Sequence, residues 1–182
     1  MERSVAQVAL FTALIAVLGI IPKITLGFGV PITAQSLGVM LCGTVLGARR
    51  GTSAVLLFLV LVAIGLPLLS GGRGGLGLFV SPSAGFLIGW PVAAFATGCI
   101  VERWRSAPLM LSASLASVVG GIGVMYIFGI VGLSIALDKT LVQSTFLVSA
   151  FIPGDIVKAL IAGGLTAWIA LVRPASLLSR RS

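Results

Sequence analysis

An acid and a base stand close together near the C-terminal end of the sequence, in the very apolar stretch "FIPGDIVKAL" (residues 151–160). Pro153 and Gly154 mark the start of a helix, on which Asp155 and Lys158, at positions i and i+3, share one face. An ionised group inside a membrane costs at least ~2.5–3.5 kcal/mol, so Lys158 needs a partner there. Asp155 supplies one. The pair can therefore bind a polar ligand, or it can form a self-contained ion pair that pins the helix end.

A second candidate is Arg73, which lies among glycines in "SGGRGGLG" (residues 70–77). Gly72, Gly74 and Gly77 have the spacing of the dinucleotide fingerprint G-x-G-x-x-G, but that motif works only between a strand and a helix of a soluble βαβ unit. Glycines on both sides of one arginine instead allow a tight backbone turn and a close approach to a ligand. We predict that Arg73 points into a cavity; the alternative is an interfacial arginine that reaches lipid head groups.

Gln35 in "VPITAQSLG" and Tyr126 in "GVMYIFG" are single polar groups inside apolar runs. Buried amide and hydroxyl groups need hydrogen-bond partners. Each of the two can therefore contact a ligand in a pocket or link one helix to another.

Small residues form a stripe on the first apolar run, where Ala9 and Ala13 are one helical turn apart, with Ala6 and Ala16 nearby. Such a stripe lets a second helix approach closely. The pattern predicts a docking face for a separate protein or, equally, a seam for internal packing.

The sequence lacks the residues that most catalytic mechanisms require. There is no histidine, and the four carboxylates are scattered, so no general acid–base pair, catalytic triad or metal-ligand set can be recognised. Cys42 and Cys99 have no metal-ligand or redox spacing and are expected to be small buried residues. No P-loop motif occurs, so any dependence on ATP must come from partner proteins. We expect a protein that is not an enzyme and that holds no metal and no cofactor.

The composition indicates an integral membrane protein. The chain has 182 residues, 58% hydrophobic and 9% charged, whereas soluble domains carry about 25% charged residues. A bilayer-spanning helix needs about 20 mostly apolar residues. The sequence therefore predicts an all-α, polytopic membrane protein with a single domain over residues 1–182. Its six transmembrane helices are expected at roughly 5–21, 34–47, 52–70, 82–101, 108–136 and 150–172, and residues 137–149 are expected to be a loop with a short surface helix.

The net charge of +8 does not indicate a nucleic-acid partner, because the basic residues follow the predicted topology. With a cytoplasmic N-terminus, the inner side receives eight of them: Arg3, Arg49, Arg50, Arg103, Arg105, Arg173, Arg180 and Arg181. The outer side receives four: Lys23, Arg73, Lys139 and Lys158. The positive-inside rule then places both termini in the cytoplasm.

The predicted outer segments differ from the inner loops. They cover residues 23–33, 70–85 and 151–155 and are rich in Gly and Pro, whereas the inner loops are short basic turns. Irregular backbone at membrane depth is tolerated only where it is buried in protein or lines a cavity. We therefore expect the three outer segments to form the walls of one pocket that opens to the outside.

The sequence resembles the BioY family, the biotin-specific S components (substrate-binding subunits) of energy-coupling-factor (ECF) transporters. The resemblance covers most of the chain and keeps the order of the family's motifs. The matching stretches are "ALFTALIAVLG", "GFGVPITAQSLGVMLCGTVLGARRG", "IGLPLLSGGRGGLG", "SPSAGFLIGWPVAAF" and "FIPGDIVKA".

The resemblance implies a six-helix protein of a bacterial or archaeal cell (inner) membrane that captures biotin in an outward-facing pocket. It also implies docking through the first helix onto a transmembrane coupling (T) subunit, with two ATPase subunits driving transport. The family's acid and lysine fall on Asp155 and Lys158, its alanine docking motif falls on Ala9 and Ala13, and the polar residue of its glycine loop falls on Arg73. Some relatives have Asn at this last position and an Arg where this chain has Leu87, so the polar contacts can differ.

The residue types suit biotin, which offers ureido N–H donors, a ureido carbonyl, an apolar ring and a carboxylate. Asp155 can accept from the N–H groups, Lys158 can donate to the carbonyl, and Arg73 can pair with the carboxylate, although these roles can be permuted. Two other hypotheses are a stand-alone secondary transporter and an S component for another small vitamin.

Overall fold

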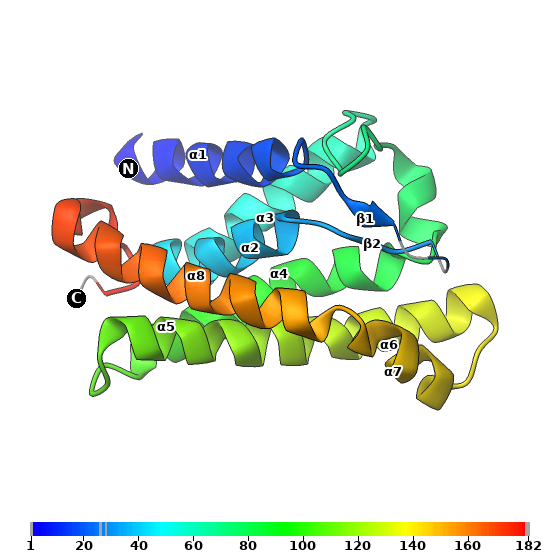
Figure 1. The fold of residues 1–182 in the computed structure, drawn as a ribbon. Coiled ribbons are helices and arrows are strands. Elements are labelled where there is room, and N and C mark those ends of the chain that lie inside the picture. The colour runs from blue at the N-terminus through cyan, green and yellow to red at the C-terminus, as the bar shows by residue number, and fades with distance from the viewer. Residues whose placement is uncertain (1, 26, 28, 181–182) are drawn as a thin grey trace.

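The computed structural model describes residues 2–25, 27 and 29–180, and the described part is almost entirely helical (Figure 1). The helices are α1 (Glu2–Leu18), α2 (Gln35–Leu41), α3 (Ala48–Ala63), α4 (Ala84–Arg103), α5 (Leu109–Val118), α6 (Met125–Leu137), α7 (Leu141–Ser149) and α8 (Ile152–Val172). A π-helical segment, Cys42–Leu46, continues α2, and another, Val119–Val124, joins α5 to α6. Short 3₁₀ helices cover Leu76–Val80 and Pro174–Ser176, and the strands β1 (Ile24–Thr25) and β2 (Pro31–Ile32) pair antiparallel.

Each predicted apolar run contains a helix, and α7 is the short helix expected within residues 137–149. Three helical stretches of the described chain are long and apolar enough to cross a membrane, namely Ala84–Arg103, Leu109–Leu137 and Ile152–Val172. Ser4–Leu18 and Gln35–Leu46 are shorter apolar helices.

The third predicted run, residues 52–70, needs correction. Its helix, α3, begins at Ala48 and ends at Ala63, so the last seven predicted residues are not helical. The backbone leaves the helix because Gly65 adopts a φ of +106° and Pro67 follows it. The chain then runs irregularly up to the glycine turn that carries Arg73.

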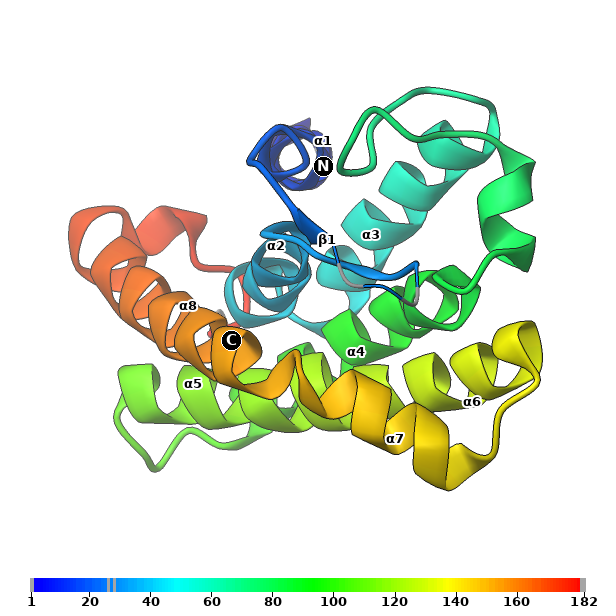
Figure 2. The ribbon, with the colours of Figure 1, turned by 45° about the vertical axis from the view of Figure 1, so that its right-hand side comes forward.

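The helices pack around α4, which contacts α3, α5 and α6, while α5 lies along α8 (Figures 1 and 2). Glycines permit the closest of these contacts. A Cβ atom at Gly85 of α4 would collide with Phe128 O and with the backbone of Gly132 on α6. The N-terminal end of α4 is therefore held directly against α6.

Both termini lie at one end of the bundle, and the β1–β2 hairpin lies at the other (Figure 1). The segment after α8 folds back onto the bundle, where Ser179 Oγ donates to Thr44 O at 2.5 Å. Gln7 of α1 donates through Nε2 to Ser176 O at 3.1 Å. The C-terminal segment thus contacts both the start of α1 and the π-helical segment after α2.

Candidate functional site

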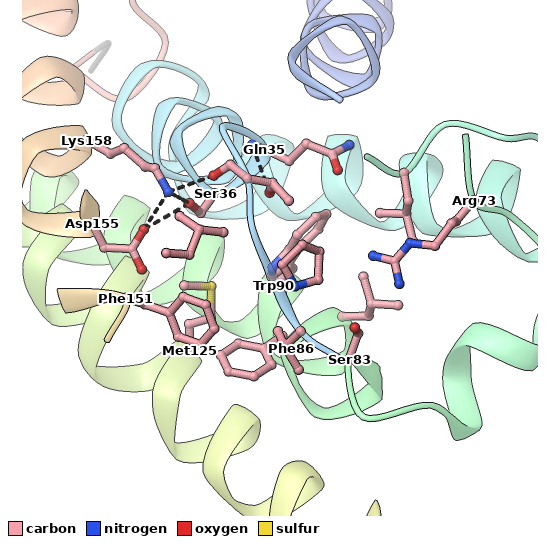
Figure 3. Close-up of a pocket in the computed structure, with 16 residues that line it drawn as sticks. Gln35, Ser36, Arg73, Ser83, Phe86, Trp90, Met125, Phe151, Asp155 and Lys158 are labelled. Carbon is pink, nitrogen blue, oxygen red and sulfur yellow. Dashed lines mark hydrogen bonds and ion pairs between the residues drawn. The ribbon is translucent and has the colours of Figure 1, made fainter. Parts of the chain in front are cut away.

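The three Gly- and Pro-rich segments meet at one cavity, as the sequence predicted. The cavity encloses about 560 Å³ of space that no atom fills, a figure that includes open solvent at its mouth. Its wall comes from residues within 30–36, from the turn at Arg73, from the first two turns of α4, from Met125 of α6 and from the start of α8. Figure 3 shows charged side chains at its two ends and aromatic ones between them.

The first polar end is a hydrogen-bonded cluster around Asp155 and Lys158. Lys158 Nζ donates to Asp155 Oδ1 at 2.8 Å, to Ser36 Oγ at 3.0 Å and to Thr33 O at 2.6 Å. Ser36 Oγ lies 3.1 Å from the same Asp155 oxygen, and Tyr126 donates its hydroxyl to Asp155 Oδ2 at 2.7 Å. The cluster therefore joins α8 to α6 and to the start of α2.

Solvent contributes little to this cluster, because the side chains of Lys158 and Asp155 are only 15% and 6% exposed. All three ammonium protons of Lys158 have an acceptor. Asp155 Oδ2 receives one donor and has capacity for another. The pair thus pins the start of α8, as one interpretation of the sequence held, and it also presents an acceptor at the cavity wall.

The second polar end is Arg73. Leu69 and Arg73 exchange backbone hydrogen bonds of 3.0 and 3.1 Å across a turn in which Gly71 and Gly72 have positive φ values of 80° and 69°, a conformation that strongly favours glycine. Arg73 Nε donates to Ser70 O at 3.3 Å, and the guanidinium points into the cavity (Figure 3). Among the described residues its terminal nitrogens have no acceptor, so they are available to an anion.

Gln35 lines the cavity, and its amide is hydrogen-bonded to the segments that form the cavity wall. Its Nε2 donates to Ile15 O and to Leu68 O, both at 3.1 Å, and its Oε1 accepts from Ser70 N at 3.0 Å. The amide is 1% exposed and has no free donor. Gln35 thus ties α1 to the loop before Arg73.

Tyr126 is also buried, at 8% exposure, but it lies outside the cavity lining. Its contact with Asp155 links α6 to α8. Tyr126 can therefore act on a ligand only through the carboxylate that it orients.

The middle of the cavity is apolar and aromatic. Trp90, Phe86 and Phe151 line it, and the last two rings meet edge to face with centroids 5.8 Å apart. The residue patterns described above did not predict these three aromatic residues, nor Ser36 and Ser83. Two of the aromatics and Ser83 occur together in "SPSAGFLIGW" (residues 81–90), one of the predicted outer segments with the start of its helix, and that clustering could have indicated them.

Ala9 and Ala13 are exposed on α1, which lies at the edge of the bundle (Figure 2). The opposite face of α1 is buried, with Thr12 Oγ1 donating to Ala54 O of α3 at 2.9 Å. Ala9 and Ala13 are therefore not packed against another described helix, whereas Ala16 is half-buried against the core.

Comparison with known proteins yields consistent matches. The model of the BioY family matches residues 2–174. The biotin transporter BioY of Rhodobacter capsulatus is 53% identical over 99% of this chain and 100% of its own length, and that of Rhizobium etli is 53% identical over 88% and 89%. The crystal structure of the S-component for biotin from an ECF-type ABC transporter superposes with a TM-score of 0.90 at 30% identity, covering 97% of this chain and 96% of that one.

Proposed function

This chain belongs to the BioY family, and we propose that it takes up biotin as the S component of an ECF-type ABC transporter. The observation that carries the assignment of the site is a cavity with two polar ends and an aromatic middle. Biotin has the complementary order of groups: a ureido ring with two donors and an acceptor, an apolar thioether ring, and a carboxylate at the end of an aliphatic chain.

In this proposal the ureido ring lies against Asp155 and Lys158. Asp155 Oδ2 accepts from a ureido N–H, using its remaining capacity. Lys158 already has three acceptors, so it must exchange one of them for the ureido oxygen. The carboxylate goes to Arg73, whose terminal nitrogens can make a charge-assisted, bidentate pair.

We also propose six membrane spans with both termini in the cytoplasm and the cavity opening outside, in a bacterial or archaeal cell membrane. Three long apolar helices and two shorter ones support this arrangement, as do the two termini at one end of the bundle and the hairpin at the other (Figure 1). The excess of arginine in the predicted inner loops favours the same orientation.

The proposed partners are a transmembrane T subunit, docked on the Ala9–Ala13 face, and two ATPase subunits. The exposed alanines support the docking face. The chain itself catalyses no reaction and needs no cofactor in this proposal, because ATP hydrolysis belongs to the partners.

The test is to express the chain alone and together with candidate T and ATPase subunits, and to measure biotin binding and ATP-dependent uptake. We expect high-affinity binding by the chain alone and full uptake only in the complex. Uptake by the chain alone that follows the proton gradient would favour a secondary transporter. If the chain bound another vitamin and excess biotin did not displace it, a different substrate would be favoured.

A further inference from the structure

Ser83 has a buried hydroxyl without a hydrogen-bond partner. The residue is 6% exposed, and among the described residues no donor or acceptor lies within reach of its Oγ. It is the residue before the first turn of α4, yet its side chain makes no capping bond to that turn. An unsatisfied hydroxyl in such a position costs free energy, and a ligand that supplies the missing partner would remove that cost.

Other buried hydroxyls in the described chain also lack partners, namely those of Thr97, Ser114, Ser117 and Ser144. These four side chains lie outside the cavity wall, whereas Ser83 is part of it. Among these residues with orphan hydroxyls, Ser83 is therefore the one that borders the cavity, and its Oγ lies just beneath the cavity wall.

Ser83 lies at the Arg73 end of the cavity, and Figure 3 shows its oxygen directed toward the space below the guanidinium. This is also where α4 begins. The amides of Ala84 and Leu87 donate to Ser81 O and Ser83 O, but no described residue accepts from those of Gly85 and Phe86. A helix N-terminus with unpaired amides favours an anion.

We propose that Ser83, the N-terminal end of α4 and Arg73 form one subsite for the carboxylate of the ligand. The proposal rests on the proposed function and assigns a second donor to it: the Ser83 hydroxyl donates to one carboxylate oxygen while Arg73 pairs with the group. Because the Ser83 hydroxyl makes no capping bond to α4, its removal should affect binding more than folding.

The experiment measures dissociation constants of purified Ser83→Ala for biotin and for the neutral biotin amide. A hydrogen bond to a charged group is worth more than one to a neutral group, so we expect biotin to bind at least about tenfold more weakly and the amide only about threefold more weakly. The melting temperature without ligand should stay the same or rise, because an unsatisfied hydroxyl has been removed. The matched control, Ser117→Ala, removes a buried orphan hydroxyl outside the cavity and should leave both constants unchanged.

A second variant, Ser83→Asp, keeps a good helix-capping residue but places a negative charge beside Arg73. This variant should bind biotin more weakly than Ser83→Ala does. It should also bind the neutral amide more tightly than the acid. Unchanged biotin affinity in Ser83→Ala, or equal losses for biotin and its amide, would overturn the carboxylate subsite. A wild-type chain that bound neither compound would refute the proposed function itself, which is a different outcome.

Discussion

Replacing either charged member of the Asp155–Lys158 pair should weaken biotin binding by at least ~30-fold. Lys158 Nζ lies 2.8 Å from Asp155 Oδ1, and both side chains are largely withdrawn from water. Removing one member of a buried, hydrogen-bonded charge pair typically costs ~2–5 kcal/mol, since the other charge is left unpaired. Every ~1.4 kcal/mol is a factor of ten in affinity. Asp155→Asn also leaves Tyr126 without its charged acceptor, and Lys158→Met leaves Thr33 O and Ser36 Oγ without their donor.

The assay is biotin titration of purified protein by calorimetry, with membrane abundance measured in parallel. Asp138→Asn and Lys139→Met make the same chemical changes at an adjacent, exposed acid and base, so both controls should bind biotin like the wild type. Abundance should fall much less than affinity in the Asp155 and Lys158 variants. If both variants bound biotin with wild-type affinity, the pair would serve only to pin α8, and the reasoning from its place in the cavity would be refuted.

Three further predictions concern topology, docking and the cavity wall. A cysteine introduced at Arg50 should react with an impermeant thiol reagent only from the cytoplasmic side and one at Leu76, which is 72% exposed, only from outside; labelling of the Arg50 position in intact cells would reject the proposed topology. Ala13→Trp should abolish assembly with the T subunit and leave biotin binding near the wild-type value, since a small-residue face admits a helix only while it stays small. Ala136→Trp, at an exposed alanine on α6, should affect neither, and loss of binding with assembly retained in the first variant would contradict docking. Gln35→Met removes three hydrogen bonds, two of them buried, and should lower the free energy of unfolding by about 1–3 kcal/mol; an unchanged melting temperature would show that the wall does not depend on this amide.

The helices could be predicted from the sequence because apolar runs bounded by Gly, Pro or charge mark them directly. The end of α3 was placed too late, although Gly65 and Pro67 mark it, because "IGLPLLS" (residues 64–70) is as apolar as the helix before it. Its departure from the helix depends on the backbone at Gly65 and Pro67 rather than on hydrophobicity. The π-helical continuations of α2 and α5 were missed for a similar reason, since they change the hydrogen-bond register and leave the apolar pattern intact.

The charged residues of the site could be predicted because charge is rare in this sequence and must be explained wherever it occurs. Ser36 and Ser83 could not be distinguished from the other serines of the sequence. The role of a serine hydroxyl depends on which hydrogen-bond partner or cavity lies beside it in the fold, and the sequence does not give that. Gln35 was identified as a polar group of the pocket, but only the three backbone partners of its amide decide that it holds the wall.

The hydrogen bonds within the site divide its polar groups by how they would respond to a ligand. Both N–H groups of the Gln35 amide are already hydrogen-bonded, so replacing Gln35 should mainly lower the free energy of unfolding. Arg73 has unused donors and Ser83 an unused hydroxyl, so their loss should appear in binding, and most strongly for ligands that bear a carboxylate. Asp155 and Lys158 are paired with each other but face the cavity, so their loss should weaken biotin and its amide alike. Measuring both ligands together with the melting temperature therefore separates the three groups, and an Asp155→Asn variant that lost biotin but kept the amide would mean that the two ends of the ligand are reversed.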